Sequence, residues 1–274
     1  MTLTRTQAVE LLARHGLSPS RALGQNFVVD PNTVRRIARL AGVGAGDHVV
    51  EVGPGLGSLT LALAETGAAV TAIELDRYVL PALREVVDGL DVRVVEGDAL
   101  TLDWSAALAD AARWQLVANL PYNVATPLVL DLLDEVPAIE QLVVMVQREV
   151  AERLAARPGT KAYGIPSVKV AYWAHAEVVA RVPPTVFLPR PRVESAIVRI
   201  TRRAGGPATA ADPARLFELV RAGFGQRRKM LRRSLAALVD PGAFERAGIR
   251  PEARAEELSV EDWGRLALAD GASS

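Results

Sequence analysis

The sequence predicts an α/β fold with a mostly parallel sheet covered on both faces, followed by a small all-α C-terminal domain. Two observations support this prediction. As far as Gln147, short valine-rich apolar runs alternate with segments of helical spacing, which is typical of repeated β-α units. Beyond about residue 205, helical patterns continue with no strand pattern among them. A chain of 274 residues is long enough for one large domain and one small domain.

Five strands and four helices are expected in the first part of the chain. The strand runs are bounded by Gly, Asp, Asn or Pro, and their continuous apolar character is typical of buried parallel strands. We expect strands at 47–52, 69–74, 92–96, 115–118 and 141–147. We expect helices between them at 59–65, 78–87, 105–112 and 127–135.

The pattern changes after Gln147. We expect helices at 148–156 and 165–175, then two closing strands at 177–182 and 195–201. The loop between these strands contains four prolines, at 183, 184, 189 and 191. Such a cluster cannot lie inside a sheet, but it can form a stiff rim over a site.

The stretch 202–212, rich in Gly and Ala, is the expected linker. Helical patterns follow it at 213–223, 227–238, 241–247 and 260–269. The predicted domains are therefore 1–205, with a helical N-terminal extension over 1–45, and 206–274.

Composition excludes several kinds of site. The chain has no cysteine and only three histidines, so a disulfide framework, a thiol nucleophile and a Cys- or His-rich metal site are not expected. Basic and acidic residues both number 32, so any nucleic-acid affinity must come from a local basic patch. No signal-peptide core is expected, and no uncharged apolar run approaches the ~18–20 residues that span a membrane. We expect a cytoplasmic monomer with no metal and no membrane contact.

A glycine loop follows the first expected strand. Val49–Val52 run into Gly53-Pro54-Gly55-Leu56-Gly57 and then into a helix. Glycines there allow positive φ and close approach of the backbone to a ligand. The spacing departs from the dinucleotide fingerprint and Pro54 removes an amide donor, so the loop suits a ligand without phosphates, such as S-adenosylmethionine. The alternative is a plain tight turn.

Two acidic residues follow the next two strands. Glu74 ends the second strand, where a carboxylate can accept both hydroxyls of a ribose. Asp98 follows the third strand, where it can accept from an adenine amino group while the adjacent Ala99 amide donates to the ring. Either acid alone could merely cap the next helix. The ordered set on three successive strand ends favours a cofactor site.

The fourth strand ends in Asn119-Leu120-Pro121-Tyr122. A polar amide, a proline and an aromatic residue at the end of a buried strand pack poorly, so the segment indicates a site; the alternative is a plain turn. The Asn119 side-chain oxygen and the Leu120 carbonyl can accept the two N–H groups of an aromatic amine and aim its lone pair at a methyl group. Tyr122 can stack on a flipped-out base, a contact worth about 1–3 kcal/mol.

These residues and three further motifs resemble the ribosomal RNA adenine N6-dimethyltransferase family, closest to its small-subunit branch. The further motifs are Gly24-Gln25-Asn26-Phe27, the segment from Val186 to Ala196 (VFLPRPRVESA) and the segment from Phe224 to Leu231 (FGQRRKML). The resemblance implies a Rossmann-like class I methyltransferase core with a mostly parallel seven-stranded sheet. It also implies that Asn26 and the backbone at Val28 contact the cofactor, with Gly53, Gly55, Glu74, Asp98, Ala99 and Asn119.

The same resemblance implies that Phe187 stacks on the target base opposite Tyr122. The alternative is a phenylalanine that anchors the proline-rich loop. The sequence departs from the family pattern at Val28, where Leu is usual, and at Arg232-Arg233-Ser234, where an Asn pair is usual.

A run of cations predicts where RNA is held. The segment 221–233 contains six cations and no acid, and on a helix three of them would share one face. These cations are Arg221, Arg227, Arg228, Lys229, Arg232 and Arg233. With Arg190 and Arg192, and Arg202 and Arg203, they could line a basic cleft between the two domains that follows an RNA backbone. A solvated basic helix is the alternative.

The predicted function is transfer of methyl groups from S-adenosylmethionine to N6 of two adjacent adenosines near the 3′ end of 16S ribosomal RNA, in a maturing small subunit. One alternative is the large-subunit branch that confers macrolide resistance. The other is a ribosome-assembly or transcription factor that keeps the fold without turnover.

Overall fold

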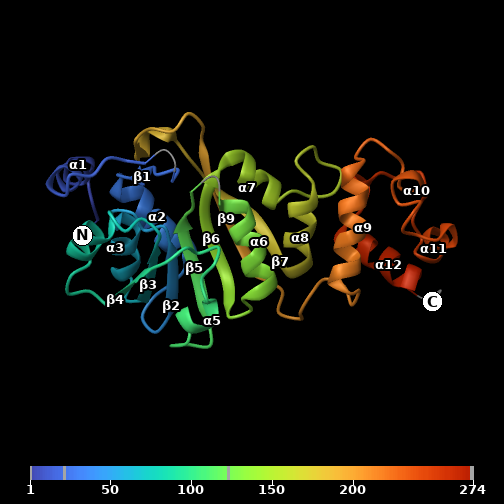
Figure 1. Cartoon of the computed structure of the whole chain (residues 1–274), viewed down its shortest axis with the longest axis horizontal. Helices are drawn as coiled ribbons and strands as arrows, with labels where there is room; N and C mark the ends of the chain where they lie inside the picture. The colour runs from blue at the N-terminus through green and yellow to red at the C-terminus, as the bar shows by residue number, and fades with distance from the viewer. Residues whose placement is uncertain (1, 21–22, 122–123, 272–274) are drawn as a thin grey trace. The chain divides into compact units, whose positions relative to one another are not determined.

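The computed structural model describes residues 2–20, 23–121 and 124–271 (Figure 1). Its internal contacts divide the chain into two units, which are described separately. Unit 1 comprises Met1–Ala151 and Glu177–Thr201, and unit 2 comprises Glu152–Ala176 and Arg202–Ser274. Unit 2 is thus larger than the predicted segment 206–274. It includes 152–176 because Tyr172 packs edge-on against Phe217, with ring centroids 5.3 Å apart.

A seven-stranded sheet with the order β4-β3-β2-β5-β6-β9-β7 forms the core of the fold. Its strands are β2 (His48–Val52), β3 (Ala69–Glu74), β4 (Val92–Glu96), β5 (Trp114–Asn119), β6 (Ile139–Gln147), β7 (Ala174–Val182) and β9 (Ser195–Arg202). The pairs β2·β3, β2·β5, β3·β4 and β5·β6 are parallel, whereas β9 is antiparallel to β6. The expected mostly parallel seven-stranded sheet is confirmed.

Central strand β2 is buried almost throughout, as the apolar run predicted. Val50 lies opposite Thr71 of β3 and Leu116 of β5, and it is fully buried. Because parallel strands point the same way, β2, β3, β4 and β5 end at one edge of the sheet. This edge carries the glycine loop, Glu74 and Asn119.

Helices follow the strands of unit 1. They are α1 (Arg5–Arg14), α2 (Pro31–Ala41), α3 (Ser58–Ala64), α4 (Leu80–Val86), α5 (Trp104–Ala107), α6 (Ala125–Glu135) and α7 (Arg148–Leu154), the last of which runs into unit 2. Helix α2 has conventional ends, since the Asp30 side chain accepts from the Thr33 amide at 2.8 Å and Gly42 stops the helix at φ 70°. Ile37 on α2 and Leu63 on α3 belong to one apolar cluster with Val49 of the sheet.

The predicted helix at 105–112 is wrong beyond residue 107. Side chains bind backbone carbonyls at and after the end of the observed helix. Arg93 donates to the Ala107 carbonyl, and the Trp114 indole donates to the carbonyls of Leu108 and Ala111, both at 3.0 Å. The segment therefore ends in turns after one helical turn.

A second, two-stranded sheet pairs distant parts of unit 1. Strand β1 (Phe27–Val28) runs antiparallel to β8 (Phe187–Leu188), which follows a 3₁₀ turn at Pro184–Val186. The prolines at 183, 184, 189 and 191 lie outside β8, as expected for residues without an N–H to donate. This pair ties the segment before α2 to the proline-rich loop.

Unit 2 contains α8 (Ile165–Trp173), α9 (Pro213–Gly225), α10 (Leu231–Ser234), α11 (Pro241–Arg246), a 3₁₀ turn at Ala255–Glu257 and α12 (Val260–Gly271). Its core surrounds the fully buried Trp263. The predicted helix at 227–238 is wrong, because only 231–234 is helical. Met230 is extended, and the amides of Leu231 and Arg232 donate to the Ala253 and Pro251 carbonyls at 2.8 and 3.0 Å.

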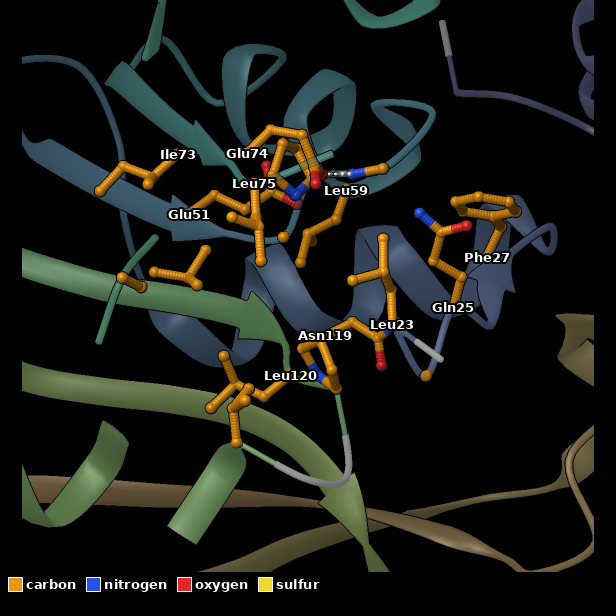
Figure 2. A pocket seen from close by; sticks show the side chains of 18 of the residues that line it. Leu23, Gln25, Phe27, Glu51, Leu59, Ile73, Glu74, Leu75, Asn119 and Leu120 are labelled. Atoms are coloured by element: carbon orange, nitrogen blue, oxygen red, sulfur yellow. Dashed lines mark hydrogen bonds between the residues drawn. The ribbon is translucent and has the colours of Figure 1, made fainter. Parts of the chain in front are cut away.

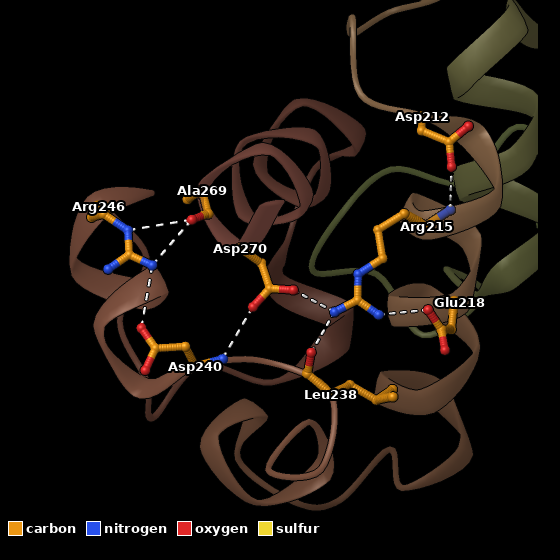
Figure 3. A network of polar contacts seen from close by, with 8 residues as sticks. All are labelled: Asp212, Arg215, Glu218, Leu238, Asp240, Arg246, Ala269 and Asp270. Carbon is orange, nitrogen blue, oxygen red and sulfur yellow. Dashed lines mark hydrogen bonds and ion pairs between the residues drawn. The ribbon is translucent and has the colours of Figure 1, made fainter. Parts of the chain in front are cut away.

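A polar network centred on Arg215 joins three parts of unit 2 (Figure 3). The Arg215 guanidinium donates to Glu218, to Asp270 near the end of α12 and to the Leu238 carbonyl. Asp270 also accepts from the Asp240 amide at 3.1 Å. This arginine therefore holds the end of α12 against α9 and the turn before α11.

In the part of the chain that the structure describes, no helix is long and apolar enough to cross a membrane.

Candidate cofactor and catalytic site

A pocket opens at the strand-end edge of the sheet in unit 1 (Figure 2). It is bounded by the ends of β2, β3 and β5, by the turn after β4 and by the segment 23–28. All eight residues predicted to contact a cofactor line it: Asn26, Val28, Gly53, Gly55, Glu74, Asp98, Ala99 and Asn119. Leu120 and Pro121 also line it, whereas Tyr122 lies outside the described residues. The fold thus gathers these side chains from separate segments of the chain.

The backbone of the glycine loop requires glycine at three positions. Gly53, Gly55 and Gly57 have φ of 70°, 56° and 84°, which residues with side chains rarely adopt. At Gly55 a Cβ would also lie 2.8 Å from the Phe27 ring. The loop is therefore pressed against β1, and its backbone forms one wall of the pocket.

Glu74 is held in a fixed orientation by two backbone amides. One carboxylate oxygen accepts from Gly55 and the other from Asp76, both at 2.9 Å. Burial raises the pKa of Glu74, and these two bonds oppose the rise because they favour the charged form. Each carboxylate oxygen has lone pairs left to accept from a ribose hydroxyl.

Asp98 and Ala99 stand at the turn after β4. One Asp98 carboxylate oxygen accepts from the Leu100 amide at 3.0 Å, which shapes this turn. Leu75 and Leu100 also line the pocket and are 52% and 44% exposed. Sequence reasoning missed both leucines, although each lies one or two residues after a predicted acid. They offer apolar contact to a planar ring.

Asn119 reaches the pocket from the end of β5. Its side-chain nitrogen donates to the Asn26 carbonyl at 3.1 Å, so its side-chain oxygen is left to accept from a ligand. The Leu120 amide donates to the Met145 carbonyl of β6 at 3.1 Å, which holds the backbone just after Asn119. Both the side chain and the backbone of this position are therefore held in place.

Phe187 is fully buried and belongs to the apolar cluster on one face of the sheet, with Val28, Val182 and Ile197. In this structure its ring anchors the proline-rich loop, which matches the alternative interpretation of this residue. Stacking of this ring on a target base stays a prediction.

Glu51 is a pocket residue that sequence reasoning did not assign. Its side chain is 1% exposed and accepts from the Thr60 hydroxyl at 2.6 Å. Burial raises the pKa of the Glu51 carboxyl to about 8, although the Thr60 bond opposes the rise. The available signal was its place in the strand that enters the glycine loop. The pocket thus includes a carboxyl that is mostly neutral at pH 7.

The six cations of 221–233 are all exposed on unit 2, and two of them are already paired. Arg227 contacts Glu256 at 2.7 Å and donates to the Lys161 carbonyl, and Arg232 contacts Glu252 at 3.2 Å. Within the described residues, Arg221, Arg228, Lys229 and Arg233 have no ion-pair partner. On unit 1, Arg190 and Arg192 lie at the surface in the loop after β8. The predicted shared helical face does not exist, because 227–229 precede α10.

The sheet order, the antiparallel strand β9 next to β6 and a glycine-loop pocket at the strand ends define a class I methyltransferase that uses S-adenosylmethionine. The residues present fit this cofactor: the Glu74 carboxylate is held in place and can still accept from hydroxyls, Leu75 and Leu100 offer apolar surface, and the glycine loop lets a ligand approach its backbone closely. The model of the ribosomal RNA adenine dimethylase family matches residues 17–269. The chain therefore belongs to this family.

Individual relatives agree with this assignment, and two solved structures share the fold. The chain is 48% identical to ribosomal RNA small subunit methyltransferase A of Bifidobacterium adolescentis, over 94% of this chain and 91% of that protein. It is 47% identical to the protein of the same name from Streptomyces coelicolor, over 94% and 93%. Its fold is similar to a dimethyladenosine transferase from Plasmodium falciparum (TM-score 0.74, 23% identity, 87% of this chain and 95% of that one). It is also similar to 23S rRNA methyltransferase ErmE (TM-score 0.69, 29% identity, 90% and 100%).

Proposed function

We propose a specific reaction for this small-subunit rRNA adenine dimethyltransferase: methylation of N6 of two adjacent adenosines near the 3′ end of 16S rRNA, with Asn119 as the residue that aligns the amine. The single observation that supports this best is the Asn119 side chain, whose nitrogen is engaged by the Asn26 carbonyl at 3.1 Å within the cofactor pocket. Its oxygen is therefore available as an acceptor. We place the enzyme in the cytoplasm, as a monomer that meets the maturing subunit.

The cofactor would be held by residues of the pocket in distinct roles. Glu74 would accept from the ribose hydroxyls and Asp98 from the adenine amino group, while Gly53 and Gly55 allow close backbone approach. Asn26 and the backbone at Val28 would close the remaining side. When bound, S-adenosylmethionine supplies an electrophilic methyl group on its sulfonium sulfur.

The protein would contribute to catalysis mainly by aligning the adenine amine with the methyl group. The nitrogen of an adenine amine is weakly nucleophilic because its lone pair is delocalised into the ring. The Asn119 side-chain oxygen and the Leu120 carbonyl would accept its two N–H groups and so favour a pyramidal nitrogen with its lone pair directed into the pocket. No strong base is required, because the amine loses its proton after it has been methylated. Tyr122 and Phe187 would stack on the flipped-out base.

RNA would be held by exposed cations. Arg221, Arg228, Lys229 and Arg233 on unit 2, and Arg190 and Arg192 on unit 1, are the candidates for phosphate contacts. Arg227 and Arg232 are weaker candidates, because each would first have to leave its glutamate.

Asn119→Ala tests the alignment mechanism. We expect at least a hundredfold slower methylation of small subunits from cells that lack the enzyme, measured by mass spectrometry of the RNA, because a directed acceptor is removed. Asn32→Ala, at an exposed position near the start of α2, is the matched control and should retain the wild-type rate. Wild-type dimethylation by Asn119→Ala would refute the proposed role.

The similarity to 23S rRNA methyltransferase ErmE makes the large subunit the second candidate substrate. Purified small and large subunits from the same cells, each offered to the enzyme with labelled cofactor, separate the two. We expect label in 16S RNA only, and label in 23S RNA would favour the second candidate.

A further inference from the structure

Gln25 is a pocket residue with no assigned role, and its side chain makes two short contacts. Its oxygen accepts from the Ser20 amide at 2.8 Å, and its nitrogen donates to one Asp76 carboxylate oxygen at 2.7 Å. Figure 2 shows this side chain at the edge of the pocket, on the segment that carries Leu23 and Phe27. Both polar atoms of the amide are therefore used, and they connect residues from two separate segments.

The Asp76 partner belongs to the turn that orients Glu74. The Asp76 amide donates to Glu74 at 2.9 Å, and the second Asp76 carboxylate oxygen accepts from the Tyr78 amide at 3.0 Å. The turn is thus fixed by its own hydrogen bonds. The bond from Gln25 fastens the N-terminal segment to an already rigid part of the pocket.

The residue after Gln25 orients the Asn119 amide. The Asn26 carbonyl accepts from the Asn119 side chain, and the Asn26 side chain in turn donates to the Gly24 carbonyl at 3.0 Å. On the far side of Asn26, strand β1 is held by its pairing with β8. Gln25 and β1 therefore anchor the two ends of the short stretch whose carbonyl sets the direction of Asn119.

We propose that Gln25 is a positioning residue: its side-chain amide fixes the segment 24–28 to the Asp76 turn, which completes the cofactor pocket and holds the Asn26 carbonyl that orients Asn119. Gln25 contacts neither reacting atom. Its effect passes through Asn26 to the catalytic amide, and through the lining of the pocket to the cofactor. This inference rests on the proposed role of Asn119 only for its effect on rate.

A swap of hydrogen-bonding groups tests the contact itself. Gln25→Glu places a carboxylate against Asp76, so the bond is removed and two like charges face each other. We expect the dissociation constant of S-adenosylhomocysteine, measured by calorimetry without RNA, to rise at least tenfold. Adding Asp76→Asn restores a donor opposite the new carboxylate and leaves an oxygen for the Tyr78 amide. The double variant should bind within about threefold of wild type.

Two further variants make the result decisive. Gln7→Glu on α1 introduces the same charge in a capping box that accepts Glu equally well, and it should leave binding unchanged. Gln25→Ala removes the bond without repulsion and covers the case in which Gln25→Glu fails to fold. With saturating cofactor, we expect Gln25→Ala to lower the single-turnover rate at least fivefold.

Each arm can overturn its own part of the proposal. Unchanged S-adenosylhomocysteine binding by Gln25→Glu, or no recovery in the double variant, would refute the contact with Asp76 as a determinant of the pocket. An unchanged single-turnover rate in Gln25→Ala would refute the effect on Asn119. The binding arm involves no RNA, so its outcome is independent of whether the proposed RNA substrate is correct.

Discussion

The most unusual residue of the pocket is Glu51, a carboxyl with almost no exposure and one hydroxyl partner, Thr60. Glu51 is buried because it lies in the apolar strand β2, in which every residue from Val49 to Val52 is buried. Burial raises its pKa from 4.5 to about 8, so the folded protein keeps a proton that the unfolded chain has released. Stability must therefore depend on pH in a defined direction.

Glu51→Gln tests this link between burial and stability. Between pH 4.5 and 8 the native state binds one proton more than the unfolded state at this position, so the free energy of unfolding falls as pH rises, by up to about 1.4 kcal/mol per pH unit. A neutral amide has no such dependence. We expect the wild-type urea midpoint, measured without cofactor, to fall relative to that of Glu51→Gln from pH 5 to pH 8. Parallel curves for the two proteins would contradict the raised pKa.

The position of a residue was easiest to predict from the sequence where it stands at a strand end. Glu74 and Asn119 could be placed because a parallel sheet brings consecutive strand ends to one edge, and this follows from pattern alone. Phe187 was different. Its motif indicated a site residue, but whether its ring is buried depends on how the proline-rich loop packs on the sheet, and no local pattern encodes that. Gln25 and Glu51 were missed because their partners, Asp76 and Thr60, are not adjacent in sequence.

At the scale of elements, the Arg5 side chain joins helix α1 to the proline-rich loop. The Arg5 guanidinium donates to the carbonyls of Thr185 and Phe187 at 3.0 and 2.9 Å. These carbonyls belong to the loop that pairs with β1 as strand β8. The apolar face of α1 meanwhile packs on Phe27 and Leu56. The N-terminal extension therefore braces the loop that carries the predicted base-stacking residue.

Arg5→Met tests this brace while keeping much of the length of the side chain. Loss of two charge-assisted bonds to the loop should lower kcat/KM for small subunits about tenfold. S-adenosylhomocysteine binding should stay within about twofold, because Arg5 does not line the pocket and the backbone pairing of β1 with β8 remains. Arg14→Met on the same helix removes an exposed ion pair with Glu85 at 2.6 Å and is the matched control. Equal activity of the two variants would show that the loop does not depend on Arg5.

The elements that sequence patterns misjudged share one physical cause. Residues 227–238 have helical spacing, yet the amides of Leu231 and Arg232 bind carbonyls at 253 and 251 instead of extending a helix. Residues 108–112 do not continue the helix because the side chains of Arg93 and Trp114 bind its carbonyls. The β1·β8 pair is two residues long and joins distant segments. In each case a partner outside the segment decides the local structure.

At the scale of the whole molecule, the formal charges sum to zero, but they are unevenly distributed along the chain, since the segment 221–233 contains six cations and no acid. Within the described residues, the basic segment of unit 2 holds both ion-paired and unpaired cations, and we expect the unpaired ones to be the stronger RNA contacts. A cation that is already paired with a glutamate contributes less binding free energy when it contacts a phosphate, because the existing ion pair must be broken first. An unpaired exposed cation that neutralises a phosphate releases a counterion condensed on the RNA.

Salt dependence distinguishes the two groups of cations. Arg228→Ala/Lys229→Ala/Arg233→Ala removes three unpaired charges. We expect the slope of log affinity for small-subunit RNA against log salt to decrease by about 2, because each phosphate that is no longer neutralised reduces the slope by about 0.7–0.9. Arg227→Ala/Arg232→Ala removes the paired charges near Glu256 and Glu252, and its slope should change by less than about 1. Both variants should bind S-adenosylhomocysteine normally, since the substitutions lie in unit 2 and the pocket lies in unit 1.

Equal slopes for the two variants would mean that ion pairing within the protein does not decide which cations hold the RNA. An unchanged slope in both would remove this segment from the RNA-binding surface, and the phosphate contacts would then have to come from elsewhere, with Arg190 and Arg192 the next to test.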